Sequence, residues 1–209
     1  MDDKTTPTRR ERERESHRQE ILDAAEEIFA EKGFGDATLE DIAKKADFAV
    51  GTIYNFFNGK NDLVNNVLVR LVKTRVAEIE KNILPKIAEP LTALRMLTDM
   101  WVEHHIRHGA FIRVAIIARM IEGKTDWNNA EDAELRDLHE IYSEMNTRVF
   151  EAGIKAGVFH KMKAEHAFTI FEGICRAFGF HWKQFNDKRP KEALADELFA
   201  VTKIALSGK

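Results

Sequence analysis

The sequence predicts an all-α protein. Apolar residues recur at spacings of three and four along most of the chain, and no alternation of apolar and polar residues typical of a β-strand persists. Only 4 prolines and 11 glycines punctuate the 209 residues, so few positions are expected to break a helix. We predict about nine helices, divided between a small amino-terminal domain of three helices and a larger helical domain.

Composition narrows the class of protein further. Hydrophobic residues make up 44% and charged residues 32% of the chain, which suits a soluble globular protein of one or two domains. A single cysteine, Cys175, excludes a disulfide within the chain and fits a reducing compartment. The chain opens without an apolar leader, and no apolar run approaches the ~18 residues of a membrane span. We therefore expect a cytoplasmic protein that does not enter a membrane.

The first helix is predicted to begin at Ser16, where Gln19 completes a capping box. Gly33 is typical of the position just past a helix end. The residues before this helix, 1–15, alternate arginine with glutamate and are predicted to form a flexible arm. The buried side of the helix is a stripe of apolar residues: Ile21, Leu22, Ala25, Ile28 and Phe29.

A short second helix is predicted after Thr38, which repeats the start signal with Asp41. Residues 46–48 form a brief turn, and a third helix runs over residues 49–57. A long fourth helix opens at residues 60–62. Two prolines interrupt the pattern after it. The apolar periodicity then predicts five more helices, over residues 91–108, 110–122, 131–156, 164–186 and 190–207.

The third helix has two unlike sides on a helical wheel, and Ile53 and Phe57 lie together on the apolar one. The opposite side carries small or hydrogen-bonding groups and no carboxylate: Gly51, Thr52, Tyr54, Asn55 and Asn58. Two short helices joined by a three-residue turn, the second with a polar face free of acids, are typical of a helix-turn-helix. Such a face can enter the major groove of DNA without repelling phosphate. The same pattern also fits a surface turn of an ordinary helical bundle.

The segment from Thr38 to Leu63, TLEDIAKKADFAVGTIYNFFNGKNDL, resembles the DNA-binding signature of the tetracycline-repressor (TetR) family of transcriptional regulators. The first helix also fits the family pattern, at Ala25, Phe29 and Gly33. The matching residues of the longer segment keep the family's spacing: Thr38, Ile42, Ala43, Ala46, Gly51, Thr52, Ile53, Tyr54, Phe57, Lys60 and Leu63.

Two positions depart from the family pattern. Asp47 replaces the glycine that is usual in the turn, and Ala49 replaces a serine that often caps the third helix and touches phosphate. Aspartate tolerates left-handed turn geometry better than most residues, so we expect the turn to be kept. Ala49 is expected at the DNA surface without the serine hydroxyl.

The resemblance implies which residues approach the bases. Thr52 and Asn55 would approach base edges, where an asparagine can pair with adenine through two hydrogen bonds. Val50 would touch a thymine methyl group.

The resemblance also implies contacts to the DNA backbone. Thr38 would offer its hydroxyl and nearby amides to phosphate at a helix start. Tyr54 and Lys60 would hold phosphates, which fix register rather than sequence. Gly51 would let the protein main chain approach DNA closely.

Charge is distributed unevenly in this region. Residues 1–60 contain ten lysines and arginines and fourteen acids, so the predicted reading domain is net negative, but residues 48–60 contain no acid. Arg9 and Arg10 of the arm are candidates for reaching DNA. The alternative is a solvated helical extension whose charges pair with one another. Because few cations are available, we expect modest and strongly salt-dependent affinity.

A single helix-turn-helix reads few bases, so two copies are expected to pair and place their reading helices about 34 Å apart. The last two predicted helices carry apolar sides broader than one bundle contact uses, and we predict a four-helix dimer interface there. The alternative is that both helices are the core of a monomer. The predicted interface residues are Phe168, Phe171, Cys175, Phe178, Trp182, Leu194, Leu198 and Val201.

The middle of the chain is the predicted sensor. In the TetR family, a bound ligand shifts the fourth helix like a lever and changes the separation of the reading helices. The resemblance therefore implies a ligand that prefers the state unable to bind DNA. Aromatic, methionine and histidine side chains suit a pocket for a small apolar or aromatic molecule, although they also suit a helical core. The candidate pocket residues are Trp101, His104, His105, His108, Phe111, Met120, Trp127, Tyr142, Met145 and Phe171.

Three other functions remain open or are disfavoured. His104 and His108 lie one helical turn apart and raise the alternative of a metal-responsive regulator, but no third ligand is identifiable. No phosphate-binding loop, zinc-protease motif or nucleophile elbow indicates an enzyme. A non-catalytic helical adaptor is the remaining alternative. Cys175 is expected to be buried and inert rather than redox-sensing.

The sequence thus predicts three parts: an arm over 1–15, a helix-turn-helix domain over 16–60, and a ligand-binding and dimerisation domain over 61–209. The expected function is that of a repressor released from a palindromic DNA operator by a small molecule. No enzymatic activity, cofactor or metal is expected.

Overall fold

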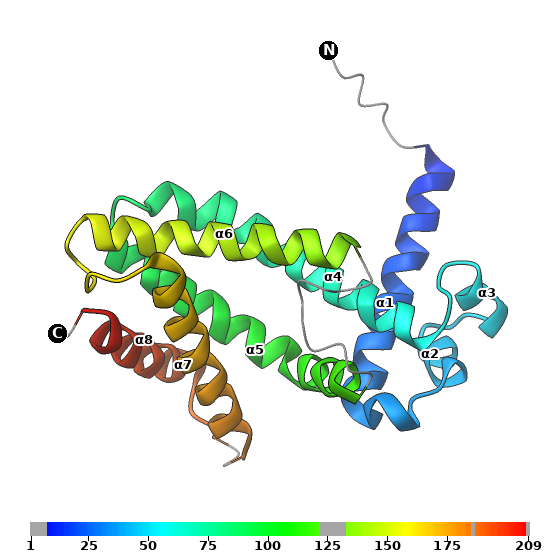
Figure 1. Cartoon of the computed structure of the whole chain (residues 1–209). Helices are drawn as coiled ribbons and strands as arrows, with labels where there is room; N and C mark the ends of the chain where they lie inside the picture. Colours follow the sequence, from blue (N-terminus) through cyan, green and yellow to red (C-terminus); the bar gives the residue numbers. More distant parts are fainter. Residues whose placement is uncertain (1–7, 122–132, 185–186, 208–209) are drawn as a thin grey trace. The chain divides into compact units, whose positions relative to one another are not determined.

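The computed structural model describes residues 8–121, 133–184 and 187–207, and within these it contains eight α-helices and no β-strand (Figure 1). The all-α prediction is confirmed. A π-helical segment, η1 (Ile79–Ile83), and a 3-10 turn, η2 (Leu84–Lys86), follow the fourth helix. The α-helices are α1 (Arg9–Asp36), α2 (Leu39–Lys45), α3 (Val50–Tyr54), α4 (Lys60–Glu78), α5 (Pro90–Ile121), α6 (Ala133–Lys155), α7 (Ala164–Gln184) and α8 (Lys191–Ser207).

The chain folds into two compact units. Unit 1 comprises Met1–Arg70 and Ala110–Thr125, and unit 2 comprises Leu71–Gly109 and Asp126–Lys209. The boundaries fall within α4 and α5, so each of these helices contributes residues to both units.

Helix α1 begins at Arg9 rather than near Ser16. Thr8 Oγ1 accepts a hydrogen bond from the Glu11 backbone N–H at 3.2 Å, and the Glu11 carboxylate accepts one from the Thr8 N–H at 2.7 Å. This capping box overrides the similar signal at Ser16. Residues 9–15, predicted as part of a flexible arm, therefore belong to the first helix, as the alternative interpretation held.

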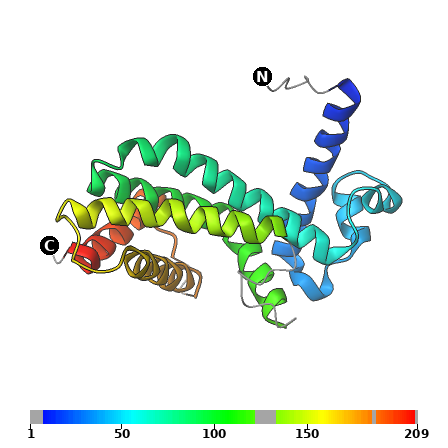
Figure 2. The same cartoon turned by 45° about the horizontal axis from the view of Figure 1, so that its top comes forward.

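Unit 1 is built from α1, α2, α3, the first part of α4 and the last part of α5. Helix α2 packs against α1 and α3, and Figure 2 shows α2 and α3 beside one another. Gly33 has a φ of 79°, the left-handed conformation that ends the regular part of α1 as predicted. The predicted apolar stripes are buried in this unit: Ile21, Leu22, Ala25, Ile28, Phe29, Ile42, Ala43, Ile53, Phe57, Leu63 and Val67.

In α5, the structure has one helix where the sequence predicted two, over 91–108 and 110–122. Gly109 costs about 1 kcal/mol relative to alanine inside a helix, which made a break plausible. Its packing explains why the helix continues. A Cβ at position 109 would lie 3.2 Å from the His105 ring, so the glycine leaves room for that ring one turn earlier.

Unit 2 has its core between α6, α7, α8 and the parts of α4 and α5 that belong to it. Helix α6 packs on α7, and α7 packs on α8, which lie together in Figures 1 and 2. The predicted bounds of these three helices agree with the structure within a few residues, over the part that is described. The core includes Ile79, Leu94, Leu97, Val149, Phe150, Phe171, Cys175 and Leu198. No helix in the described residues is both long and apolar enough to cross a membrane.

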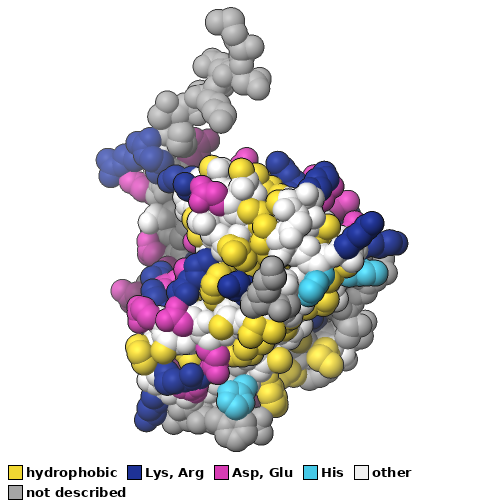
Figure 3. Space-filling model, turned by 90° about the vertical axis from the view of Figure 1, so that its left-hand side faces the viewer, with side chains coloured by type: hydrophobic (Ala, Val, Ile, Leu, Met, Phe, Trp, Pro, Cys, Tyr) yellow, Lys and Arg dark blue, Asp and Glu magenta, His cyan; other side chains and the backbone are white. Residues whose placement is uncertain are grey.

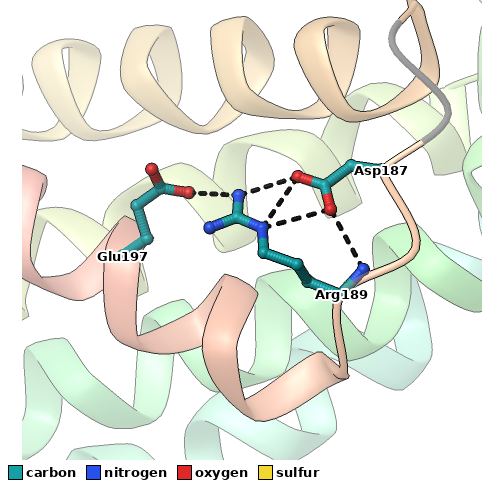
Figure 4. A network of polar contacts seen from close by, with 3 residues as sticks. All are labelled: Asp187, Arg189 and Glu197. Carbon is teal, nitrogen blue, oxygen red and sulfur yellow. Dashed lines mark hydrogen bonds and ion pairs between the residues drawn. The ribbon is translucent and has the colours of Figure 1, made fainter.

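The connection between α7 and α8 is held by one arginine. The Arg189 guanidinium donates to both Asp187 carboxylate oxygens, with Nη2 to Oδ2 at 2.7 Å, and to Glu197 of α8 at 2.7 Å (Figure 4). Hydrogen bonds from the Arg189 side chain and backbone lower the pKa of Asp187. These contacts fix the start of α8 beside the end of α7.

Candidate DNA-binding site

The turn between α2 and α3 depends on one left-handed residue. Asp47 has a φ of 59°, at the position where the TetR pattern has glycine. Aspartate adopts this conformation at lower cost than most residues, so the turn is kept as expected. The Phe48 N–H donates to the Ala43 carbonyl at 2.9 Å and closes the turn.

Helix α3 turns its apolar side inward and its uncharged side to solvent. Ile53 is fully buried and Phe57 is 1% exposed, whereas Tyr54 is 60% exposed. The other residues predicted to touch DNA from this helix are exposed or half-buried: Ala49, Val50, Gly51, Thr52 and Asn55. An exposed helical surface without carboxylates can approach phosphate without repulsion.

Gly51 lies on this exposed side with open space around it. A Cβ built at this position meets no other atom within 4 Å, and the residue does not have a positive φ. Neither packing nor backbone conformation therefore requires a glycine here. A glycine here leaves the main chain open to close approach from outside.

Thr38 caps the start of α2 with its hydroxyl. Thr38 Oγ1 accepts a hydrogen bond from the Asp41 N–H at 3.1 Å, and Asp41 accepts one from the Thr38 N–H at 3.2 Å. Hydrogen bonds from Lys32 and then Thr38 lower the pKa of Asp41. Because the hydroxyl acts as an acceptor in the cap, its own proton stays available to a phosphate oxygen.

Lys60, which is predicted to hold a phosphate, contacts the end of α1 in the structure. Its ammonium donates to the carbonyl oxygens of Phe34 at 2.8 Å, Gly35 at 3.2 Å and Ala37 at 2.8 Å. An ammonium has three N–H groups, so these bonds occupy all of them. Lys60 therefore closes the end of α1, and none of its N–H groups is left for a phosphate.

The amino-terminal part of α1 presents a basic side next to Phe56. The Arg14 guanidinium lies 5.5 Å from the Phe56 ring centroid. A recess of about 440 Å³ is lined here by Arg10, Glu11, Glu13, Arg14, His17 and Phe56. Arg9, which the sequence also nominated, instead pairs with Glu13 at 2.7 Å. Arg10 and Arg14 are thus the arginines of α1 that line the recess beside Phe56.

The first part of α4 is tied to α1 by charged groups. Arg70 donates to Asp23 at 2.6 Å and to Glu26 at 2.9 Å. The Arg18 guanidinium lies 5.3 Å from the Phe57 ring centroid and also donates to Asn66. Within unit 1, α4 is therefore held firmly to the helix that supports α2 and α3.

Some of the predicted pocket residues form an aromatic cluster in unit 2, made by Trp101, His105, Gly179 and Trp182. Trp101 stacks on His105 with ring centroids 4.7 Å apart, and Trp182 meets Trp101 edge-on at 5.9 Å. Gly179 permits this contact between α5 and α7. A Cβ there would lie 2.5 Å from the His105 ring and 2.9 Å from Trp101.

A second group of predicted pocket residues lies between α6 and α7. Tyr142 is 5% exposed, and its ring centroid is 6.0 Å from that of Phe168. Phe171 is buried, and Met145 packs on the same core. The remaining candidates are spread more widely. Phe111 packs against Phe29 in unit 1, Met120 is 60% exposed, and Trp127 lies outside the described residues.

The histidine pair stands side by side, with the His104 and His108 ring centroids 4.8 Å apart. In the described part of the chain, no group of three or more His, Cys, Asp or Glu is placed to hold a metal ion. Burial, followed by the charge of Arg75, lowers the pKa of His104 to about 3. Cys175 is buried, and burial raises the pKa of its thiol, so little thiolate is present.

Sequence reasoning did not single out Arg75, which the structure places against Tyr142. The guanidinium carbon lies 4.3 Å from the Tyr142 ring centroid. A signal was present, because position 75 continues the spacing of the buried residues Leu68 and Leu71. An arginine where the pattern favours an apolar residue indicates a polar site inside a core.

An open recess of about 740 Å³ on unit 2 contains none of the predicted pocket residues. Its walls come from η1, η2, α5 and α8 and carry charges that pair with one another. Lys191 donates to Glu103 at 2.6 Å, and Arg95 lies 2.9 Å from Asp99. This charged lining differs from the apolar and aromatic pocket that the sequence predicts.

Most residues predicted for the dimer interface lie inside a single chain. Val201 is 39% exposed and Phe178 is half-buried, whereas six are buried in the chain itself: Phe168, Phe171, Cys175, Trp182, Leu194 and Leu198. The side assigned to a partner is therefore the side that packs within unit 2. The same two helices expose another apolar set, which we call the outer face: Ile170 (37% exposed), Phe180 (68%), Val201 (39%) and Ile204 (60%). Figure 3 views the carboxyl-terminal end and shows hydrophobic side chains gathered among charged ones.

The short helices α2 and α3, joined by a tight turn and exposing an uncharged side, define a DNA-binding protein of the helix-turn-helix class. Residues 21–67 match the model of the bacterial regulatory proteins of the tetR family. YvdT of Bacillus subtilis, an uncharacterized helix-turn-helix-type transcriptional regulator, is 39% identical over 189 residues, which cover 90% of this chain and 94% of that protein. The chain belongs to the TetR family and is a DNA-binding transcriptional regulator.

Two further comparisons show likeness along most of the chain. NicS of Pseudomonas putida, a helix-turn-helix-type transcriptional repressor, is 25% identical over 197 residues, which cover 91% of each chain. The solved structure of the transcriptional regulator FadR from Bacillus subtilis in complex with stearoyl-CoA has a TM-score of 0.69 and 19% identity, and covers 88% of this chain and 97% of that one. The second likeness shows that the fold is shared along most of the chain.

Proposed function

We propose that the protein is a repressor that binds a palindromic DNA operator as a homodimer and leaves it when a small apolar or aromatic molecule binds. Residues 16–60 would read DNA with help from the start of α1, and residues 61–209 would bind the ligand and the partner. The observation that carries the DNA-reading part is the uncharged, exposed side of α3, with open space at Gly51.

The contacts to DNA follow from the exposed groups. Asn55 would pair with a base edge, with Val50 and Thr52 beside it at the border of the face. Tyr54 and Thr38 would donate their hydroxyl protons to phosphates, which sets register. Arg10 and Arg14, from α1, would add charge near the segment after α3.

Pairing through the outer face of α7 and α8 would bring two reading helices onto one operator. Phe180 and Ile204 are 68% and 60% exposed on two helices that pack against one another, and a partner that covers them would withdraw this apolar surface from water. A two-fold dimer is the commonest arrangement of soluble oligomers and matches a palindromic site.

Repression and release are supported by the relatives. NicS carries the name of a repressor, and FadR was solved with a ligand, stearoyl-CoA. In this chain, unit 2 combines buried aromatic rings with a few polar groups, as small-molecule sites do. Helix α4, which contributes residues to both units, is the natural element to carry a change from one to the other.

Selection of bound sequences from a random DNA pool tests the proposal, followed by gel-shift titration of the enriched site. We expect a palindrome, and we expect Asn55→Ala to lose about 1–3 kcal/mol of binding free energy at one base position of each half-site. Asn82→Ala is the matched control, because Asn82 is exposed on η1 in unit 2. Enrichment of no sequence, or equal losses in both variants, would contradict the reading role of α3.

A further inference from the structure

Arg75 is a partly buried cation for which the described residues supply no counter-ion. It lies on α4, in the part that belongs to unit 2, and one of its N–H groups donates to the Tyr142 hydroxyl oxygen. Its Nε is buried and has no hydrogen-bond partner in the residues the structure describes. Within those residues, no carboxylate forms an ion pair with it. Withdrawing a guanidinium from water without a counter-ion is costly, so the fold retains a position suited to an anion.

Polar groups around Arg75 have unused hydrogen-bonding capacity. Burial raises the pKa of Tyr142 to about 12, so the phenol keeps a proton that it can donate while its oxygen accepts from Arg75. Asn146 donates to the Tyr142 carbonyl at 2.7 Å, but its side-chain oxygen is buried and, among the described residues, has no partner. Burial and the charge of Arg75 lower the pKa of His104 and keep its imidazole neutral, so it carries one N–H.

The acidic residue whose charge affects these groups, Glu172, already pairs with another residue. The charge of Glu172 contributes to the raised pKa values of Tyr142 and Cys175. Its carboxylate, however, accepts a hydrogen bond from Arg176 at 2.7 Å, and in the described structure no bond joins it to Arg75. The positive charge of Arg75 therefore stays uncompensated by a direct ion pair.

Apolar side chains of α7 stand beside the polar group. The Phe168 ring lies 6.0 Å from the Tyr142 ring, and Phe171 and Cys175 are buried in the same core. One end of the site is thus cationic and hydrogen-bonding, and the other is apolar. A ligand that matches both ends has an anionic head and an apolar body.

We propose that the effector of this regulator is a carboxylic acid with an apolar body, whose carboxylate pairs with the Arg75 guanidinium and accepts a hydrogen bond from the Tyr142 hydroxyl. The proposal rests on the proposed function, in which a small molecule releases the protein from DNA. The planar guanidinium matches a carboxylate with two parallel hydrogen bonds. A neutral analogue of the same shape leaves the cation unpaired and is rejected for that reason.

Binding of such a ligand has to move α4 within unit 2. Tyr142 is 5% exposed and Asn146 is fully buried, so a carboxylate reaches the buried Nε of Arg75 only after side chains of α4 and α6 separate. Because Arg75 belongs to α4, the new ion pair acts directly on that helix. Binding of the carboxylate and displacement of α4 would therefore occur together.

Calorimetric titration of the full chain without DNA tests the carboxylate specificity. The probes are benzoate and octanoate, each beside its neutral amide, benzamide and octanamide. We expect at least one acid to bind about tenfold or more tightly than its amide, the ratio that a charge-assisted hydrogen bond provides. Equal binding of acids and amides, or no binding of either acid at millimolar concentration, overturns the proposal.

Variants locate the site. Arg75→Met should abolish the preference for the acid, and Tyr142→Phe should weaken acid binding several-fold. Arg148→Met, an exposed arginine of α6, is the matched control and should bind like the unmodified protein. Thermal unfolding without ligand separates binding from folding: Arg75→Met should melt at or above the unmodified protein. A lower melting temperature together with unchanged acid preference would show that Arg75 is structural and overturn the assignment.

Gel shifts on the selected operator distinguish this proposal from the proposed function. If the protein binds DNA but does not prefer an acid to its amide, the carboxylate proposal is wrong and the proposed regulatory function is unaffected. If acids bind through Arg75 but leave the DNA complex intact, the site stands and ligand-driven release fails. Release by an acid, abolished in Arg75→Met, supports both.

Discussion

On α3, different residues serve the fold and the binding of DNA. Gly51 has no neighbour within 4 Å of a built Cβ, while Ile53, two positions later, is fully buried. Side chains at the first position affect only what approaches from outside, whereas side chains at the second decide whether α3 docks at all. Substitutions of Gly51 should therefore change DNA binding, whereas substitutions of Ile53 should change the stability of the fold.

Gly51→Ala should weaken operator binding without destabilising the fold. We expect roughly a tenfold loss of affinity, about 1.4 kcal/mol, because a methyl group would stand between the main chain and DNA. The free energy of unfolding should stay unchanged or rise by about 0.5–1 kcal/mol, since alanine favours a helix. Gel shift and urea denaturation measure the two effects. Gly35→Ala, also in open space, is the control for DNA binding.

Lys60→Met should lower stability instead. Its ammonium serves three carbonyl groups at the end of α1, and methionine would leave them without that donor. We expect a loss of about 1–3 kcal/mol in the free energy of unfolding. Lys45→Met, which removes only a surface pair with Glu27, should leave the stability almost unchanged. A stable Lys60→Met variant with weakened DNA binding would instead favour the phosphate contact that the family pattern implies.

At the scale of elements, α1 shows how two similar local signals compete. Both Thr8 and Ser16 are followed three residues later by a side chain able to complete a capping box. In the structure, Thr8 is the cap, and Ser16 lies inside the helix, where its hydroxyl donates to Glu20 at 2.9 Å. Pairs such as Arg9 with Glu13 support the extra turns. The extension carries Arg10 and Arg14 on a helix rather than on a loose arm.

The side of α1 that carries Arg14 should contribute to the salt dependence of DNA binding. Arg14→Gln should reduce the slope of log affinity against log salt by about 0.9 for each phosphate that the arginine neutralises, with the same operator preference. Arg9→Gln is the control, because Arg9 is engaged with Glu13. Titrations between low and physiological salt measure the slopes. Identical slopes for both variants would exclude α1 from the interface.

The fold was largely predictable because its signals are periodic and local. The stripes of α1 to α4, the turn at Asp47 and the bounds of α6 to α8 all follow from apolar spacing, caps and one left-handed residue. The continuity of α5 through Gly109 was not, because it depends on how His105 packs in three dimensions.

The site was predictable only in part, for a similar reason. The uncharged face of α3 can be inferred from the sequence, but the three carbonyl partners of Lys60 come from a segment more than 20 residues away. In α7 and α8, apolar residues occur on more than one side, and periodicity alone does not distinguish the side packed in the chain from the outer face. The exposed fractions of the side chains in the structure distinguish the two sides.

At the scale of the whole molecule, charge and pairing have to be considered together. The formal net charge is −3, so general attraction to DNA is weak and binding depends on local surfaces. Two copies on one operator double those local contacts without changing the chain. In the proposed dimer, the outer face of α7 and α8 would therefore contribute to affinity as well as to specificity.

Phe180→Glu should separate the dimer and leave the chain folded. The side chain is 68% exposed, so a carboxylate there costs the single chain little but opposes burial against a partner. We expect analytical ultracentrifugation to show a monomer at micromolar concentration, and operator binding to fall to that of one half-site. Ile106→Glu, at a side chain that is 53% exposed on α5, is the control. A dimer that persists in Phe180→Glu would place the interface elsewhere.

Gly179 and Phe180 are consecutive residues with opposite surroundings. The first fits between the rings of His105 and Trp101, and the second points outward. One peptide bond thus joins the interior stack to the proposed interface between subunits. A rearrangement of those rings would tilt the side chain of Phe180. The stability of the proposed dimer should therefore depend on what occupies the interior of unit 2. A molecule that weakens the dimer would then regulate transcription without contacting α3.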